Sequence, residues 1–190
     1  MNNTKNIPER YLHELSTLVS NLNLDEINTC ISVIRKVWFS GGQIITLGNG
    51  GSSLTALHFI NDWNKSIFLA TGKKFFGRSL VDNLGLIMSY SNDISFEDVF
   101  VEQLKNIMKP SDLVIGISGS GNSINVIKAI QYASDNGAMT IGLSGYDGGL
   151  LRKTAQYNFC ANCNDMQLSE DVHFIFGHMV MKSLCEGGNS

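Results

Sequence analysis

The segment from Ile117 to Ser123, ISGSGNS, constrains the fold of this chain more than any other. It follows the apolar run Leu113 to Ile115 and precedes a helix-like stretch from Ile124 to Asn136. A strand that ends in a loop of glycine and serine and continues as a helix directs free backbone N–H groups and the positive end of the helix dipole at one point. That point favours a phosphate group, although an ordinary strand-to-helix turn has the same local pattern.

The side chains of this loop suit an anion site without a cation. Ser118, Ser120 and Ser123 supply hydroxyl groups, while Gly119 and Gly121 let the backbone approach a ligand closely and adopt positive φ. The loop contains no Lys or Arg. Backbone dipoles and hydroxyl groups would therefore hold any phosphate bound here.

Two further segments repeat the pattern of strand, small-residue loop and helix. The predicted strand from Gln43 to Leu47 ends in GNGGSS, residues 48–53, and the predicted strand from Met139 to Leu143 ends in SGYDGG. Short strands are also predicted from Arg78 to Val81 and from Tyr157 to Cys160, which makes about five. Ligands of open parallel sheets bind at the edge where such loops meet. The sequence therefore predicts an α/β fold with a ligand site at that edge.

Two amphipathic helices are predicted ahead of the first strand, from Pro8 to Asn21 and from Leu24 to Ser40, because apolar residues recur there at helical spacing. We expect both at an oligomer interface. The 190 residues are 43% hydrophobic and include two prolines, which is typical of one compact α/β domain. The expected organisation is a single domain over residues 1–190, with a helical segment at 1–40 and an α/β core at 41–190.

Charge and composition exclude several classes of partner. The chain has 14 Lys and Arg against 17 Asp and Glu, and no basic run is longer than pairs such as Lys73-Lys74, so nothing favours nucleic acid or an anionic membrane surface. No apolar stretch approaches the roughly 18 residues of a membrane-spanning helix, and the polar start MNNTKN does not resemble a signal peptide. We therefore expect a cytoplasmic protein whose four cysteines are thiols.

Polar side chains that could bind a metal or contact a substrate follow the first loop. In the predicted helix from Ser53 to Lys65, His58 and Asp62 are one turn apart on one face. Such a pair is either a local hydrogen-bonded pair or a way to present two metal ligands. Later, SNDISFEDVF places Asn92 and Asp93 in a predicted polar loop before a helix, where each would either cap that helix or face a substrate.

The predicted final helix, from Gln167 to Cys185, carries further ionisable residues. Glu170 and His178 are about two turns apart and share a broad face, whereas His173 lies elsewhere on the helix among apolar residues. A histidine in such surroundings is more often part of the core than a ligand. Three of the four histidines nevertheless lie on two helices that also carry carboxylates, which favours a site.

These motifs, in this order, are similar to those of a known family. The chain resembles the sugar isomerase (SIS) domain proteins and, within them, the phosphoheptose isomerases, in the segments GNGGSS, SNDISFEDVF, VIGISGSGNSINVIKAI, TIGLSGYDGG and EDVHFIFGH. The resemblance runs from the N-terminal helices to the end. It implies an α/β three-layer sandwich of flavodoxin-like topology, with a five-stranded parallel sheet preceded by the N-terminal helices.

The resemblance also implies an activity and a site. The expected enzyme is a phosphosugar aldose–ketose isomerase in heptose biosynthesis that converts sedoheptulose 7-phosphate to D-glycero-D-manno-heptose 7-phosphate by metal-assisted proton transfer, as a homotetramer with sites at subunit interfaces. The implied zinc ligands are His58, Asp62, Glu170 and His178, of which Asp62 and His178 also transfer the proton. The implied substrate and phosphate contacts are Asn49, Gly50, Gly51, Ser52, Asn92, Asp93, Ser118, Gly119, Ser120, Ser123 and Glu170.

Two of these residues depart from the family pattern. Asp62 stands where the family has the Glu that serves as acid/base, and Glu170 stands where it has Gln. An aspartate side chain is one methylene shorter, so a proton within reach of a glutamate would lie farther from Asp62. The departures leave a second hypothesis, in which the chain is a non-catalytic SIS module that binds a sugar phosphate or acts as an assembly or regulatory factor.

Overall fold

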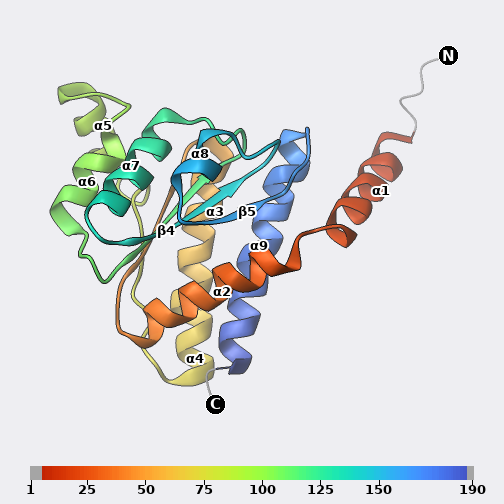
Figure 1. The fold of residues 1–190 in the computed structure, drawn as a ribbon, viewed down its shortest axis with the longest axis horizontal. Helices are drawn as coiled ribbons and strands as arrows, with labels where there is room; N and C mark the ends of the chain where they lie inside the picture. The colour runs from red at the N-terminus through yellow and green to blue at the C-terminus, as the bar shows by residue number, and fades with distance from the viewer. Residues whose placement is uncertain (1–5, 188–190) are drawn as a thin grey trace.

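The structure, a computed structural model, describes residues 6–187 (Figure 1). One sheet contains the five strands β1 (Ile44–Gly48), β2 (Gly77–Ser79), β3 (Leu113–Ser118), β4 (Met139–Ser144) and β5 (Tyr157–Cys160). All neighbouring strands are parallel, and their order is β2-β1-β3-β4-β5. This is the flavodoxin-like order, in which the winding reverses between β1 and β3. The predicted fold class is confirmed.

The helices of the described chain are α1 (Ile7–Ser20), α2 (Leu24–Phe39), α3 (Gly50–Asp62), α4 (Phe68–Thr71), α5 (Leu84–Asp93), α6 (Val99–Ile107), α7 (Ile124–Asp135), α8 (Gly149–Thr154) and α9 (Met166–Glu186). A π-helical turn, η2 (Trp63–Ile67), joins α3 to α4 without a break. These three elements form one helical rod over residues 50–71. The rod runs beside α9, which is the longest helix (Figure 1).

Two hydrophobic clusters, one on each face of the sheet, give the fold its three layers. On one face, α2, α3 and α9 pack large side chains such as Trp38, Phe59 and Phe176 against the strands. On the other face, α6, α7 and α8 contribute side chains such as Phe100 and Leu151 to a second cluster. Because successive strand residues point to opposite faces, strands covered on both sides are mostly apolar, as β3 is from Leu113 to Ile117.

The two N-terminal helices have different roles. α2 buries seven residues, among them Trp38, whose indole N–H donates to the carbonyl oxygen of Lys74 at 2.9 Å. The apolar side of α2 is therefore covered within the chain, and an interface between the N-terminal helices and another subunit stays a prediction. α1 buries no residue and extends away from the sheet (Figure 1). The Tyr11 hydroxyl links it to α9 by donating to Asp171 at 2.6 Å, a hydrogen bond that raises the pKa of Tyr11 to about 12.

The larger differences from the predicted boundaries lie at α3, at α5 and at β2, which spans Gly77–Ser79 instead of Arg78–Val81. α3 begins at Gly50 instead of Ser53, because Asn49 is extended and the glycines enter the helix directly. Asn92 and Asp93 form the last turn of α5 instead of a loop. Both side chains are exposed at this helix end, where polar residues are readily accommodated.

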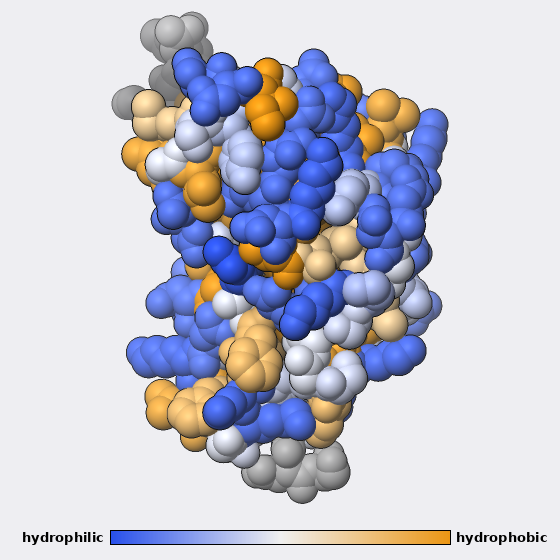
Figure 2. Space-filling model, turned by 90° about the vertical axis from the view of Figure 1, so that its left-hand side faces the viewer, coloured by the Kyte–Doolittle hydropathy of each residue, from blue (hydrophilic) through white to orange (hydrophobic). Residues whose placement is uncertain are grey.

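Hydrophilic residues cover most of the face seen in Figure 2, and hydrophobic residues gather there in small separate patches. Some apolar side chains of the described chain are well exposed: Leu54, Leu69, Leu84 and Met88 have exposed fractions of 63–71%. Within residues 6–187, no helix has the length and apolar character that crossing a bilayer requires.

Candidate functional site

The loops after β1 and β3 lie side by side at the carboxyl edge of the sheet. The side-chain amides of Asn49 and Asn125 bond to each other in both directions, at 2.8 and 3.0 Å. Gly48 fits so closely that a Cβ there would lie 2.8 Å from the Ser52 carbonyl oxygen and 2.9 Å from that of Ile117. The winding of the sheet reverses between these two strands, and ligands of such folds bind at this point.

The loop after β3 folds tightly around its hydroxyl groups. Gly121 has a φ of +68° and donates its N–H to the Ser118 carbonyl oxygen at 2.9 Å. The buried Ser118 hydroxyl donates to Ser123 Oγ at 3.0 Å, and Ser120 Oγ accepts the Asn122 N–H at 3.2 Å. The Ser118 and Ser123 hydroxyls therefore meet at the N-terminus of α7, where the helix dipole is positive, while the Ser120 hydroxyl is engaged with the backbone of the same loop.

The loop after β4 completes the same edge. Gly145 donates its N–H to the Gly119 carbonyl oxygen at 2.9 Å, and Leu151 donates to that of Gly121 at 2.8 Å. The three small-residue loops thus meet as predicted. A pocket of about 410 Å³ opens beside them, lined by Ser120, Asn122, Tyr146, Asp147, Asn164 and Met166.

His58 and Asp62 on α3 meet His178 on α9, and we call these three residues the histidine–aspartate cluster. His58 Nε2 lies 3.1 Å from His178 Nε2 and 3.2 Å from Asp62 Oδ2. His178 Nε2 lies 3.7 Å from the same carboxylate oxygen. The side chains are 31% (His58), 25% (Asp62) and 49% (His178) exposed, so the cluster is accessible from solvent. The ring of Phe174 supports His58, with the ring centroids 4.7 Å apart.

The donor set of the cluster fits a divalent metal ion such as zinc. Tetrahedral zinc binds imidazole nitrogens at about 2.0–2.1 Å, so two ligand atoms of one ion lie roughly 3.3 Å apart. The three separations in the cluster, 3.1, 3.2 and 3.7 Å, bracket that value. Without a metal, the two imidazoles form a hydrogen bond in which one nitrogen donates to the other.

Glu170 lies apart from the cluster, against Gly51 at the N-terminus of α3. A Cβ at Gly51 would lie 2.5 and 2.9 Å from the two carboxylate oxygens of Glu170, so glycine leaves room for this side chain. The positive end of the α3 dipole favours a negative charge at this place. The group of converging ligand atoms consists of His58, Asp62 and His178, and Glu170 is not among them.

Asn92 and Asp93 are also separate from the other predicted site residues within the chain. Asn92 donates its side-chain N–H to Asp93 Oδ1 at 2.8 Å, and both side chains are exposed. They end α5, which lies at the far side of the molecule from α9 (Figure 1).

His173 belongs to the core. Its ring is fully buried on α9, and neither ring nitrogen has a hydrogen-bond partner. Burial lowers its pKa to about 4, while the neighbouring backbone of Ser144 acts in the opposite direction with a smaller effect. The hydroxyl of Ser144, at the end of β4, is also buried and unpaired. The sequence left His173 open between core and site, and its burial shows that it is a core residue.

We expect His173 to make the protein less stable in acid. Its pKa is 6.5 in an unfolded chain and about 4 in the folded one, so the unfolded state binds the proton first. The contribution of His173 to the free energy of unfolding is therefore fully present above pH 6.5. It decreases as the pH drops towards 4, by about 2 kcal/mol at pH 5 and roughly 3 kcal/mol at pH 4. Urea unfolding at pH 7 and pH 5 measures this loss. A His173→Leu variant should lose less stability between the two pH values, and an unchanged difference would contradict the assignment.

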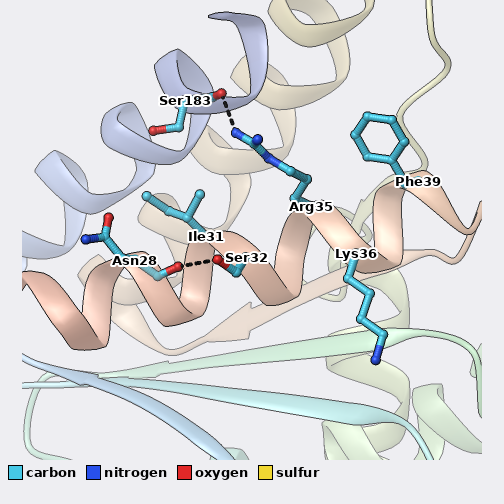
Figure 3. Close-up of a pocket in the computed structure, with 7 residues that line it drawn as sticks. All are labelled: Asn28, Ile31, Ser32, Arg35, Lys36, Phe39 and Ser183. Atoms are coloured by element: carbon cyan, nitrogen blue, oxygen red, sulfur yellow. Dashed lines mark hydrogen bonds between the residues drawn. The ribbon is translucent and has the colours of Figure 1, made fainter. Parts of the chain in front are cut away.

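The structure also has pockets that contain none of the predicted site residues. Figure 3 shows one of about 580 Å³, between α2 and the end of α9. Arg35 lines this pocket, and its guanidinium group already donates to the Ser183 carbonyl oxygen at 2.8 Å. The Ser32 hydroxyl likewise donates to the Asn28 carbonyl oxygen at 2.8 Å. Size alone therefore does not identify the functional site in this chain.

Two residues of the loop edge were not predicted. Asn125 bridges the first and second loops, and Met166 packs against Gly119 so closely that no Cβ fits there. In the sequence, Asn125 is an ordinary polar residue in the first turn of a helix. Its burial distinguishes it, and burial cannot be recognised from the sequence. Met166 comes from the start of α9, and nothing local in the sequence connects it to the loop.

Comparison with known proteins agrees with this geometry. A family model described as SIS domain matches residues 10–145. The phosphoheptose isomerase of Helicobacter hepaticus is 36% identical over 155 residues, which are 80% of this chain and 79% of that protein. A protein of Thermoplasma acidophilum named "Probable phosphoheptose isomerase" is 33% identical over 178 residues, 94% of this chain and 97% of its own.

The fold is also found among solved structures. A phosphoheptose isomerase from Francisella tularensis has a TM-score of 0.89 and 19% sequence identity, with 98% of this chain and 100% of that chain covered. At this identity the likeness concerns the fold alone. Together with the family match over residues 10–145 and the identity of 33% along 94% of the sequence, it leads to one conclusion. The chain belongs to the SIS domain family, with phosphoheptose isomerases among its relatives.

Proposed function

We propose that this protein is a phosphosugar aldose–ketose isomerase that interconverts sedoheptulose 7-phosphate and D-glycero-D-manno-heptose 7-phosphate. The observation that carries the proposal is the histidine–aspartate cluster, which converges from two helices in a chain whose relatives are named phosphoheptose isomerase. His58 lies eight residues beyond the start of α3, about 12 Å along the helix from the Gly-rich loop. This separation suits a sugar phosphate whose reacting carbons and phosphate are at opposite ends.

The phosphate is proposed to bind between the first two loops. The Ser118 and Ser123 hydroxyls, which meet at the N-terminus of α7, support this placement, and Ser120 of the same loop is the third proposed contact. The backbone of Gly119 and the first loop would border the same space, through Asn49, Gly50, Gly51 and Ser52. Binding energy from this remote phosphate would hold C1 and C2 of the sugar in place for reaction.

Proton transfer between C1 and C2 is assigned to Asp62 and His178. Oδ2 of Asp62 faces both imidazoles, and Oδ1 of the same carboxylate accepts the side-chain N–H of Asn61 at 3.3 Å, a hydrogen bond that Oδ1 would exchange for the substrate proton. His178 is the most exposed member of the cluster, and the ring nitrogen that does not hold the metal would exchange a proton with a hydroxyl oxygen of the sugar. A zinc ion held by His58, Asp62 and His178, with Glu170 as a proposed fourth ligand or substrate contact, would polarise the sugar carbonyl.

A homotetramer with sites at subunit interfaces is proposed from the surface of the chain. α1 buries no residue, and Leu54, Leu69 and Leu84 are 64–71% exposed, so a neighbouring subunit would cover apolar area. In such an assembly Asn92 and Asp93 of one subunit would contact the sugar hydroxyls in another. The cytoplasm is the proposed location, because the four cysteines are free.

Proton NMR in D2O tests the reaction directly. We expect the zinc-supplemented protein to convert sedoheptulose 7-phosphate to an aldose with new anomeric signals, and to exchange a C1 proton for deuterium, because the transferred proton passes through groups in contact with solvent. Exchange without product would indicate a different phosphosugar. Phosphosugar binding without exchange or product would support the non-catalytic SIS module, for which the altered residues Asp62 and Glu170 are the argument.

A further inference from the structure

Each residue of the histidine–aspartate cluster has a buried neighbour in the sequence. These neighbours are Phe59 and Trp63 on the helical rod, and Gly177 on α9. Successive residues of a helix point about 100° apart. The cluster side chains can therefore face solvent while these adjacent residues face the interface between the two helices.

The three neighbours contact one another across that interface. The indole Nε1–H of Trp63 donates to the Gly177 carbonyl oxygen at 2.9 Å. The rings of Phe59 and Trp63 are stacked, with centroids 4.8 Å apart and an interplanar angle of 22°. Gly177 lies against the edge of the Phe59 ring so closely that a Cβ would overlap it. The two helices thus approach as closely as a bare backbone and a ring allow.

We infer that Trp63 is a positioning residue, whose indole hydrogen bond to Gly177 holds His178 at the distance from His58 and Asp62 that a metal ion requires. The metal itself rests on the proposed function, whereas the contact between the helices does not. The side chain of Asp62 is short, and its carboxylate oxygen is already 3.7 Å from His178 Nε2. A small separation of the helices would therefore break the ligand set.

The position of the π-helical turn agrees with this role. η2 begins at Trp63, directly after Asp62. π-turns within α-helices occur often at functional sites. The residue after Trp63, Asn64, is also engaged, because its side chain exchanges two hydrogen bonds with the backbone of Gly77, at 2.9 and 3.0 Å. The rod is therefore anchored on two sides at the place where it carries the cluster.

The chain contains a matched control for removal of this hydrogen bond. Trp38 is the other of the two tryptophans. It is 1% exposed and donates its indole N–H to the Lys74 carbonyl oxygen at 2.9 Å. Trp38→Phe and Trp63→Phe therefore remove the same kind of bond from equally buried positions. Only Trp63 lies between the two helices that carry the histidine–aspartate cluster. The two variants separate a general loss of stability from a specific effect on the site.

The experiment measures zinc affinity of the full-length, metal-free protein by competition with a chelator. We expect Trp63→Phe to weaken zinc binding by about 10- to 100-fold, the range for residues that orient metal ligands, and Trp38→Phe to leave it unchanged. Equal affinities of the two variants would overturn the inference. If the unaltered protein binds no zinc, the proposed metal is wrong, and the second measurement then decides about Trp63.

That second measurement is NMR of the metal-free protein with ¹⁵N-labelled histidine. The four histidines give few signals, so each can be followed. We expect Trp63→Phe to shift the imidazole signals of His58 and His178 and to leave that of His13, on α1, in place. Trp38→Phe should move none of these three. Unshifted His58 and His178 signals in Trp63→Phe would overturn the inference independently of zinc.

A compensating pair of substitutions tests the role of helix separation. Gly177→Ala places a methyl group against Phe59, and we expect it to lower zinc affinity at least tenfold. Adding Asp62→Glu lengthens the carboxylate by one methylene, which should recover most of that loss. If the double variant binds zinc no better than Gly177→Ala, helix separation does not control the ligand set and the inference is wrong.

Discussion

Replacing Ser120 with glutamate is expected to lower the affinity for sedoheptulose 7-phosphate by more than 100-fold. The loop has no positive side chain to offset an added carboxylate, so a phosphate there would rest on hydroxyl groups and backbone dipoles alone. Two like charges about 4 Å apart repel by roughly 4 kcal/mol at an effective dielectric constant of 20. A 100-fold loss corresponds to about 2.7 kcal/mol, so the repulsion suffices even if the side chain turns partly away.

Calorimetric titration of the sugar phosphate into each variant measures this effect. Ser32→Glu is the matched control, because Ser32 is exposed on α2 and the same charge is added far from the loops. The control should bind like the unaltered protein. Affinity retained within tenfold in Ser120→Glu would place the phosphate elsewhere than on the loop after β3.

His178→Ala is expected to lower kcat by about 10³-fold or more and to remove bound zinc. The substitution deletes a proposed proton-transfer group, whose contribution alone is typically 10²- to 10⁴-fold, and one of the converging metal ligands. The fold should survive, because the His178 side chain is 49% exposed. Turnover is followed by NMR, and zinc content by elemental analysis of the purified protein.

His13→Ala provides the control for this variant, since His13 is an exposed histidine on α1. It should retain both zinc and activity. If His178→Ala kept its zinc and a rate within tenfold of the unaltered protein, the histidine–aspartate cluster would not be the reacting centre. Loss of zinc with a retained rate would show that catalysis uses the remaining residues without the metal.

The features that the sequence predicted are local ones. The strand-loop-helix units could be identified because glycine, serine and apolar runs affect only the backbone near them, and β3 with its serine loop was found where expected. The pairing of His58 with Asp62 follows from helical spacing alone. The parallel sheet, its loop edge and its count of about five strands follow from repetition of the same unit and from the short apolar runs beside it.

The tertiary structure decided what depends on packing between distant segments. His178 is 120 residues from His58, and only the contact between α3 and α9 brings the two Nε2 atoms to 3.1 Å. The same packing buries His173 and leaves Glu170 against Gly51, outside the cluster. Glu170, His173 and His178 have different surroundings because each side chain leaves α9 in a different direction. The sequence does not show which neighbouring elements lie in those directions. Thus the sequence indicates which side chains are candidates for chemistry, whereas the distances between them arise from the folded core.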